Sequence, residues 1–154
     1  VDVNEDIRKC AAKDVTVYIC EGSDMRDIRG DSVDVVFASE LLEHLKNTEE
    51  LFATLLEIYR VLKKGGKFII ICPNIRYLAD KYWDFIDHRL PLSHVSLKEG
   101  LRLYNYKIKK VVSKFLPYTT KSVLPKNAFL LRLYLKLPPL WRLIGKQMFI
   151  VAEK

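Results

Sequence analysis

The chain is 154 residues long and 49% hydrophobic, which is enough for one domain with a real core. Its apolar runs are far shorter than the ~20 residues that span a bilayer. Its three cysteines lack metal-ligand spacing, so we expect free thiols in a reducing cytoplasm. The net charge of +7 is uneven, because residues 1–96 carry −4 and residues 97–154 carry +11. The basic end indicates an anionic partner or a solvated basic face.

Predicted strands and a short helix alternate along the first part of the chain. Residues 1–4 ("VDVN") have the pattern of a strand end, and residues 5–13 have that of a short helix. Residues 15–20 and 33–39 are rich in β-branched side chains, which is typical of strands. A polar loop connects these two predicted strands, and a helical turn follows the second.

The next unit is a helix followed by a buried strand. Asn47 is predicted as the helix N-cap, with an acidic residue three positions later as in a capping box. Leucines and isoleucines at helical spacing extend this helix to about Lys64. Gly65 or Gly66 can adopt the left-handed conformation that closes a helix. Residues 67–72 are apolar on both faces, which is typical of a strand in a parallel sheet.

The pattern changes in the second half. Residues 74–105 are predicted to form loops and helix, and residues 106–116 and 146–154 to form two strands that pair antiparallel at an edge of the sheet. An insert at 117–145, rich in proline, connects these strands. The fold class is therefore α/β: one domain spanning residues 1–154, with a mainly parallel sheet and a C-terminal antiparallel strand pair.

Polar residues follow the predicted strands at their carboxyl ends, where open α/β sheets bind ligands. Asp2 closes the first strand, Asp24 and Met25 follow the second, and Ser39 and Leu41 follow the third. A carboxylate at a strand end can accept both hydroxyls of a ribose. A second carboxylate can accept from an adenine amino group while a neighbouring backbone N–H donates to the ring. These positions predict a nucleoside cofactor.

Four stretches together resemble a known family. In chain order they are "VDVN", "EGSDMRDI", "DVVFASELLEHL" and "RVLKKGGKFIIICPN". They are similar to the successive motifs of class I S-adenosylmethionine-dependent methyltransferases of the small-molecule type-11/type-23 kind. The resemblance implies a Rossmann-like sheet and S-adenosylmethionine as the cofactor.

The resemblance also implies individual roles for the strand-end residues. Asp2 would bind the ribose hydroxyls, and Asp24 would bind the adenine amino group beside the backbone of Met25. Ser39 and Leu41 would border the methionine and adenine parts of the cofactor. The alternative for the two aspartates is a loop or helix-capping role.

One departure from the family concerns its glycine-rich loop, which should precede residues 1–4 and is absent from this sequence. We therefore expect the first strand and helix of the fold to be missing from residues 1–154. In the family this strand lies between the strand that ends at Asp2 and the strand at 33–39. On this expectation the fragment alone binds S-adenosylmethionine weakly or not at all and is inactive.

The predicted activity is methyl transfer from S-adenosylmethionine to a small-molecule or lipid-linked acceptor. An oxygen acceptor also needs a base, and His44 and His88 are the candidates; helix packing is the alternative role of His44. His88 and His94 lack the spacing and further ligands of a metal site, so none is predicted. A degenerate binding module without catalysis is one alternative function. A nucleic-acid methyltransferase is less favoured, because no base-clamping motif is present.

The insert contains an apolar stretch, residues 129–144, with Arg132, Lys136 and Arg142 spaced through it. Such a stretch can lie at a membrane surface, cover the pocket as a lid or contact another subunit. The proline pair Pro138-Pro139 should break any continuous helix here. We therefore predict a cytoplasmic protein with a possible peripheral membrane contact, and the three roles of the insert remain open.

Overall fold

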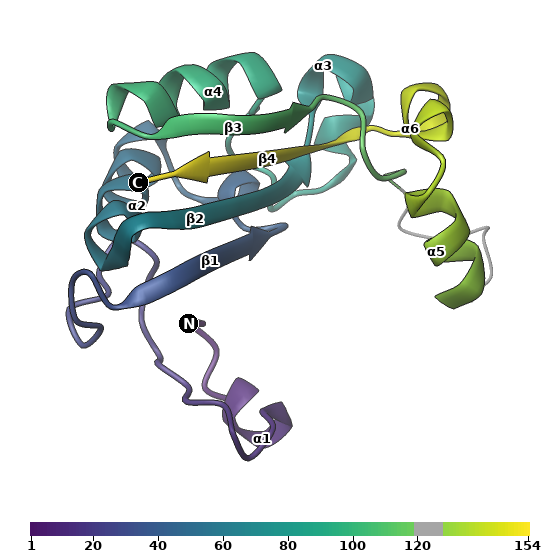
Figure 1. Cartoon of the computed structure of the whole chain (residues 1–154). Coiled ribbons are helices and arrows are strands. Elements are labelled where there is room, and N and C mark those ends of the chain that lie inside the picture. The colour runs from purple at the N-terminus through teal and green to yellow at the C-terminus, as the bar shows by residue number, and fades with distance from the viewer. Residues whose placement is uncertain (119–127) are drawn as a thin grey trace.

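The computed structural model describes residues 1–118 and 128–154 (Figure 1). The first part of the predicted insert, 119–127, lies outside the described residues. The α-helices in chain order are α1 (Ile7–Cys10), α2 (Thr48–Val61), α3 (Ile75–Leu78), α4 (His94–Leu103), α5 (Ala128–Leu135) and α6 (Pro138–Ile144). Two 3₁₀ helices, η1 (Leu42–His44) and η2 (Ala79–Asp84), lie between them.

Four strands form one sheet in the order β1-β2-β4-β3 (Figure 1). They are β1 (Val33–Ser39), β2 (Leu62–Pro73), β3 (Lys107–Val112) and β4 (Gln147–Glu153). The β1–β2 pair is parallel, and β4 runs antiparallel to both β2 and β3. The sheet thus confirms the predicted α/β fold and the antiparallel strand pair at its C-terminal edge. It is not mainly parallel as predicted, because two of the three strand pairings among the described residues are antiparallel.

The core lies between one face of the sheet and the helices α2 and α4. Phe68 of β2 and Ile150 of β4 are fully buried on that face. Tyr106 packs beneath the two helices and donates its hydroxyl hydrogen to the backbone oxygen of Leu55 in α2 (2.8 Å). Ile69, on the opposite face of β2, is only partly buried. The strand was predicted to be covered on both faces. In the described structure one face is buried and the other is only partly covered.

Residues 15–20 are not a strand, which corrects the sequence prediction. Their sheet-like contact is a single parallel bridge between Asp2 and Ile19. It consists of the hydrogen bonds from Asp2 N–H to Tyr18 O and from Cys20 N–H to Asp2 O, both 3.1 Å. β-Branched side chains favour a strand only where a neighbouring strand is available to pair and pack with them, and the described residues provide no more than this bridge.

Helix α2 begins as predicted but ends earlier. The side chain of Asn47 accepts a hydrogen bond from the N–H of Glu50 (2.9 Å), so Asn47 is the N-cap. The helix stops at Val61 rather than near Lys64, because Leu62 is already extended and pairs with β1. Gly65 does adopt a left-handed conformation (φ 78°), but within β2.

Helices α5 and α6 are separate, as the proline pair predicted (Figure 1). They are attached to the domain through aromatic contacts. Tyr134 donates a hydrogen bond to the carbonyl oxygen of Phe115. Trp141 donates to the carbonyl oxygen of Tyr134 (2.9 Å) and packs edge-on against the ring of Phe115 (5.1 Å between centroids). These contacts hold the two helices near the end of the sheet at which β1 and β2 finish.

Candidate functional site

The parallel strands β1 and β2 end at the same edge of the sheet (Figure 1). Beyond β1, the N–H of Glu40 donates to the carbonyl oxygen of Ile71 (3.0 Å), and Glu40 has a positive φ of 51°. This conformation is uncommon for a residue other than glycine and turns the chain sharply. The short helix η1 follows directly, so the residues of the "ELLEHL" stretch lie at the carboxyl end of the strand.

Glu43, His44 and His88 form a polar cluster at this edge. Glu43 is fully buried, and neither of its carboxylate oxygens has a hydrogen-bond donor among residues 1–118 and 128–154. His44 Nε2 lies 3.8 Å from Glu43 Oε1. The rings of His44 and His88 are 5.3 Å apart between centroids. The structure therefore brings together the two histidines that the sequence selected as candidate bases, and it adds Glu43, which the sequence did not select.

Hydrogen bonds orient both imidazoles. His44 Nδ1 lies 3.1 Å from the carbonyl oxygen of Asp87. His88 Nδ1 lies 2.8 Å from the carbonyl oxygen of Tyr82, and its Nε2 lies 3.2 Å from the hydroxyl of Tyr118. A carbonyl oxygen can only accept, so each Nδ1 carries hydrogen. In the neutral rings both Nε2 atoms therefore carry a lone pair.

Burial controls the protonation of the surrounding groups. Loss of solvent raises the pKa of Glu43 to about 7. Partial loss of solvent around its carboxylate, and then repulsion from Glu43, raise the pKa of Glu40 to about 7 as well. The raised pKa is better supported for Glu43 than for Glu40, because the Glu43 side chain is fully buried whereas Glu40 is exposed. Burial also raises the pKa of the Cys72 thiol, so this cysteine is a neutral part of the core.

A cavity of about 370 Å³ lies between the N-terminal segment and β1. Asp2, Met25 and Leu41, three of the five predicted cofactor residues, line it; Asp24 and Ser39 do not. The rest of its wall is mostly aliphatic, and no lysine or arginine side chain is among its described lining residues. The cavity lies between the Asp2 segment and β1, where the sequence analysis placed the missing first strand, so its apolar lining fits that strand as well as the ribose and adenine of the cofactor.

The predicted adenine-binding groups are engaged with other protein groups. The N–H of Met25 donates to a carboxylate oxygen of Glu57 (3.0 Å). The Nε–H of Arg26 is shared between both carboxylate oxygens of Asp24 (3.0 and 3.1 Å), and Arg26 Nη2 also donates to Oδ2; these contacts lower the pKa of Asp24. Asp2 accepts from the N–H of Asn4 (2.8 Å), which is the loop role considered as its alternative. Asp24 and Met25 would each have to exchange a protein partner for the adenine.

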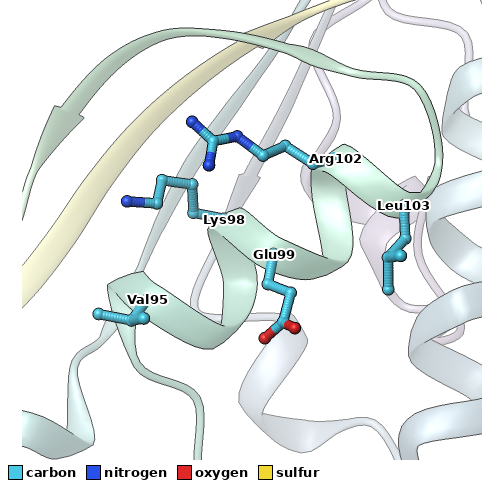
Figure 2. Close-up of a pocket in the computed structure, with 5 residues that line it drawn as sticks. All are labelled: Val95, Lys98, Glu99, Arg102 and Leu103. Carbon is cyan, nitrogen blue, oxygen red and sulfur yellow. The ribbon is translucent and has the colours of Figure 1, made fainter.

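Another hollow, of about 480 Å³, lies on the outer surface of α4 (Figure 2). Lys98 and Arg102 point to one side of the helix, and Glu99 and Leu103 point to the other. All five lining residues belong to this single helix, so no second element faces them across the hollow. We assign no function to it.

Residues 1–70 match a family model described as a methyltransferase domain. The fold is similar to that of a methyltransferase from Archaeoglobus fulgidus that depends on S-adenosylmethionine (20% identity, TM-score 0.69), with 99% of this chain and 73% of that chain covered. A second such enzyme, from Mesorhizobium loti, has 12% identity and a TM-score of 0.70 over 99% and 78% of the two chains. A third, from Methanosarcina mazei, has 15% identity and a TM-score of 0.62 over 86% and 64%. No curated protein matches the sequence.

The chain therefore has the fold of class I S-adenosylmethionine-dependent methyltransferases. The motif resemblance agrees with this fold and with the family model over residues 1–70. Among the described helices, none has the length and apolar character that crossing a membrane requires.

Proposed function

We propose that the chain supports methyl transfer from S-adenosylmethionine to a small-molecule or lipid-linked acceptor. The observation that carries this proposal is the short connection from β1 to η1. Leu41 on this connection lines the cofactor cavity, and Glu43 and His44 immediately after it belong to the polar cluster. One turn of backbone thus adjoins both a nucleoside-sized cavity and a group of proton acceptors at the carboxyl end of the sheet.

The protein's part in this reaction is to bind, align and exclude water. Bound S-adenosylmethionine supplies an activated methyl group, so alignment of the acceptor contributes most of what the protein must add. Asp2 would hold the ribose hydroxyls, and Ser39 and Leu41 would border the cofactor. For a hydroxyl acceptor, the Nε2 lone pair of His44 or His88 would accept the proton, because Nδ1 of each ring is directed at a backbone carbonyl.

The lipid-linked class of acceptor is favoured by the surface of α5 and α6. Their described aliphatic side chains are substantially exposed: Leu133 46%, Leu135 39%, Leu137 40%, Leu140 37%, Leu143 77% and Ile144 41%. Arg132, Lys136 and Arg142 lie among them and are also exposed. Apolar and cationic side chains together suit the surface of an anionic bilayer. A lid over the pocket and a contact between subunits are the alternative roles of this surface.

A binding module without catalysis is the second candidate function. This candidate is favoured because the two groups predicted to contact adenine already have protein partners. The N–H of Met25 donates to Glu57, and the carboxylate of Asp24 accepts from Arg26. The two candidates differ in whether the chain binds S-adenosylmethionine and turns it over.

Methyl transfer can be tested with methyl-tritiated S-adenosylmethionine, a total lipid extract in vesicles and an aqueous small-molecule extract. The assay should use residues 1–154 and, if the gene encodes residues ahead of Val1, the longer chain too. We expect label in the lipid or small-molecule fraction and its loss in Asp2→Ala. Calorimetric binding without label transfer by either chain would favour the binding module. Label in added nucleic acid alone would instead contradict the proposed acceptor class.

A further inference from the structure

We propose that Glu43, His44 and His88 form a binding site for a divalent transition-metal ion, with Zn²⁺ as the best-suited ion. One potential ligand atom from each residue lies within 4.8 Å of the other two. Two imidazole nitrogens and one carboxylate oxygen are a common three-ligand set for zinc and its neighbours in the first transition row. These residues come from two segments of the chain, so the fold assembles the set.

Glu43 supplies the strongest observation. Its side chain is fully buried, and among the described residues neither carboxylate oxygen has a hydrogen-bond donor. The neighbouring Glu40 carboxyl can pair with Glu43 only when one of the two carries a proton. Buried polar atoms in folded proteins nearly always have a partner, because leaving one unpaired costs free energy. The nearby His44 Nε2, at 3.8 Å from Oε1, is beyond hydrogen-bond distance. An ion between these groups would satisfy a carboxylate that the described protein atoms leave unsatisfied.

The histidines are already oriented as metal ligands. A ligating histidine almost always donates its second ring N–H to a carbonyl or carboxylate, which fixes the ring and directs the other nitrogen at the metal. His44 makes this contact with the carbonyl oxygen of Asp87 (3.1 Å), and His88 makes it with that of Tyr82 (2.8 Å). In the neutral rings the remaining nitrogen, Nε2, is the atom available to the ion.

The backbone also holds the two contributing segments together. The carbonyl oxygen of Glu43 accepts hydrogen bonds from the N–H groups of Arg89 (2.8 Å) and Leu90 (3.1 Å). These bonds join η1 to the residues that immediately follow His88. The separation between the two halves of the site is therefore set by main-chain contacts and not by side-chain packing alone.

Only a small closure would complete the site. Ligand atoms at ~2.1 Å from a tetrahedral zinc ion are about 3.4 Å apart, so a set spanning up to 4.8 Å must contract by up to roughly 1.4 Å. The hydroxyl of Tyr118, now 3.2 Å from His88 Nε2, would have to release that nitrogen. Three protein ligands leave a fourth position open. If the proposed function holds, that position would take the acceptor oxygen and lower its pKa. The ion would then replace the two histidines as the means of deprotonation, because it occupies their Nε2 lone pairs, and the proton would pass to solvent.

Calorimetry and cobalt spectroscopy can test the site without any methyl-transfer assay. Residues 1–154, stripped with EDTA, would be titrated with ZnCl₂ and separately with CoCl₂. We expect one ion per chain and the visible absorption of a low-symmetry cobalt site. Glu43→Gln, which keeps the shape of the side chain, and His88→Gln should each weaken binding at least 10-fold. His94→Asn is the matched control, because His94 contacts Asn74 outside the cluster, and its affinity should stay unchanged.

Thermal unfolding separates a lost site from a lost fold. Zn²⁺ should raise the melting temperature of the wild type and of His94→Asn but not that of folded Glu43→Gln. Equal affinity in Glu43→Gln, absence of stoichiometric binding, or a thiolate–cobalt band from the free cysteines would each overturn the proposed site. Methyl transfer measured with and without EDTA is a separate readout. Activity that survives EDTA while binding is confirmed would refute only the catalytic role of the ion.

Discussion

Arg60→Ala tests how the loop that carries Asp24 and Met25 is held. The guanidinium of Arg60, on α2, donates to the backbone oxygens of Met25 (2.8 Å) and Ile28 (2.9 Å). It also donates to both carboxylate oxygens of Glu57 (2.8 and 2.9 Å), and Glu57 in turn accepts from the N–H of Met25. Removing Arg60 should release the loop from the helix and destabilise the domain.

The expected loss can be worked from these contacts. A hydrogen bond to a charged group contributes about 1.5–3 kcal/mol when it is well shielded. The Arg60 side chain is 37% exposed, so we reduce this to about 1 kcal/mol for each of its two backbone bonds because water screens them. The pair with Glu57 adds about 0.3–0.5 kcal/mol. The total is about 2 kcal/mol, or a fall of about 1 M in the urea midpoint for a slope near 2 kcal/mol/M.

Urea denaturation followed by circular dichroism measures this change. Arg26→Ala is the control, because Arg26 contacts the same loop only through an exposed pair with Asp24, and its midpoint should not move. The hydrogen bond from Arg60 lowers the pKa of Glu57, so the stability from this pair is present above the unfolded value of ~4.3 and is lost as the pH falls. The difference between wild type and Arg60→Ala should therefore shrink below about pH 4. Equal urea midpoints for wild type and Arg60→Ala at pH 7 would refute the role of Arg60 in holding the loop.

Three further predictions concern the cofactor, a helix cap and the membrane surface. In a longer chain that supplies the glycine-rich loop, Asp2→Ala should weaken S-adenosylmethionine binding about 10- to 1,000-fold in calorimetry, from roughly 1.5–3 kcal/mol per hydrogen bond, whereas Asp14→Ala should not. Equal affinity would remove Asp2 from the site. Asn47→Ala should lower the unfolding free energy by about 1 kcal/mol, and an unchanged urea midpoint would show that the cap is dispensable. Co-sedimentation of the protein with anionic vesicles should fall with added salt and with Arg132→Glu but not with Arg29→Glu. Equal co-sedimentation with anionic and neutral vesicles would favour the role of the insert as a lid over the pocket.

The elements that the sequence predicted well are those with a strong local signal. The apolar strand at 67–72 lies within β2, and the strand predicted at 146–154 contains β4, in which every second side chain is buried. Asn47 caps α2 through a hydrogen bond within its own turn. In each case the residues that determine the structure are neighbours in the chain, so periodicity and capping rules are sufficient.

The errors arise where a distant segment decides the local conformation. Helix α2 ends at Val61 because Leu62 pairs with Val33 of β1, and because the carbonyl oxygens of Arg60 and Val61 accept hydrogen bonds from residues 31–32 (2.9 Å each). The sequence placed the end near Lys64 since lysine and glycine there make a plausible stop. Pairing with β1 removes the last residues from the helix despite their favourable propensity. The glycines instead serve the turn beside Lys154, whose carbonyl oxygen accepts from the N–H of Gly65 (3.0 Å).

The sequence selected His44 and His88 of the polar cluster but not Glu43, and the local backbone explains why. In an α-helix, residues repeat every 3.6 positions, and Leu42 and Leu45 would place Glu43 toward the edge of an apolar face. The structure has a 3₁₀ turn instead, with about three residues per turn. In this geometry Leu42 and Glu43 are both fully buried, while Leu41 is exposed and lines the cavity beside β1. The same turn that buries an ionisable group therefore also sets one wall of the cavity. A change in its backbone should disturb metal binding and cofactor binding together, whereas Glu43→Gln should affect the metal alone.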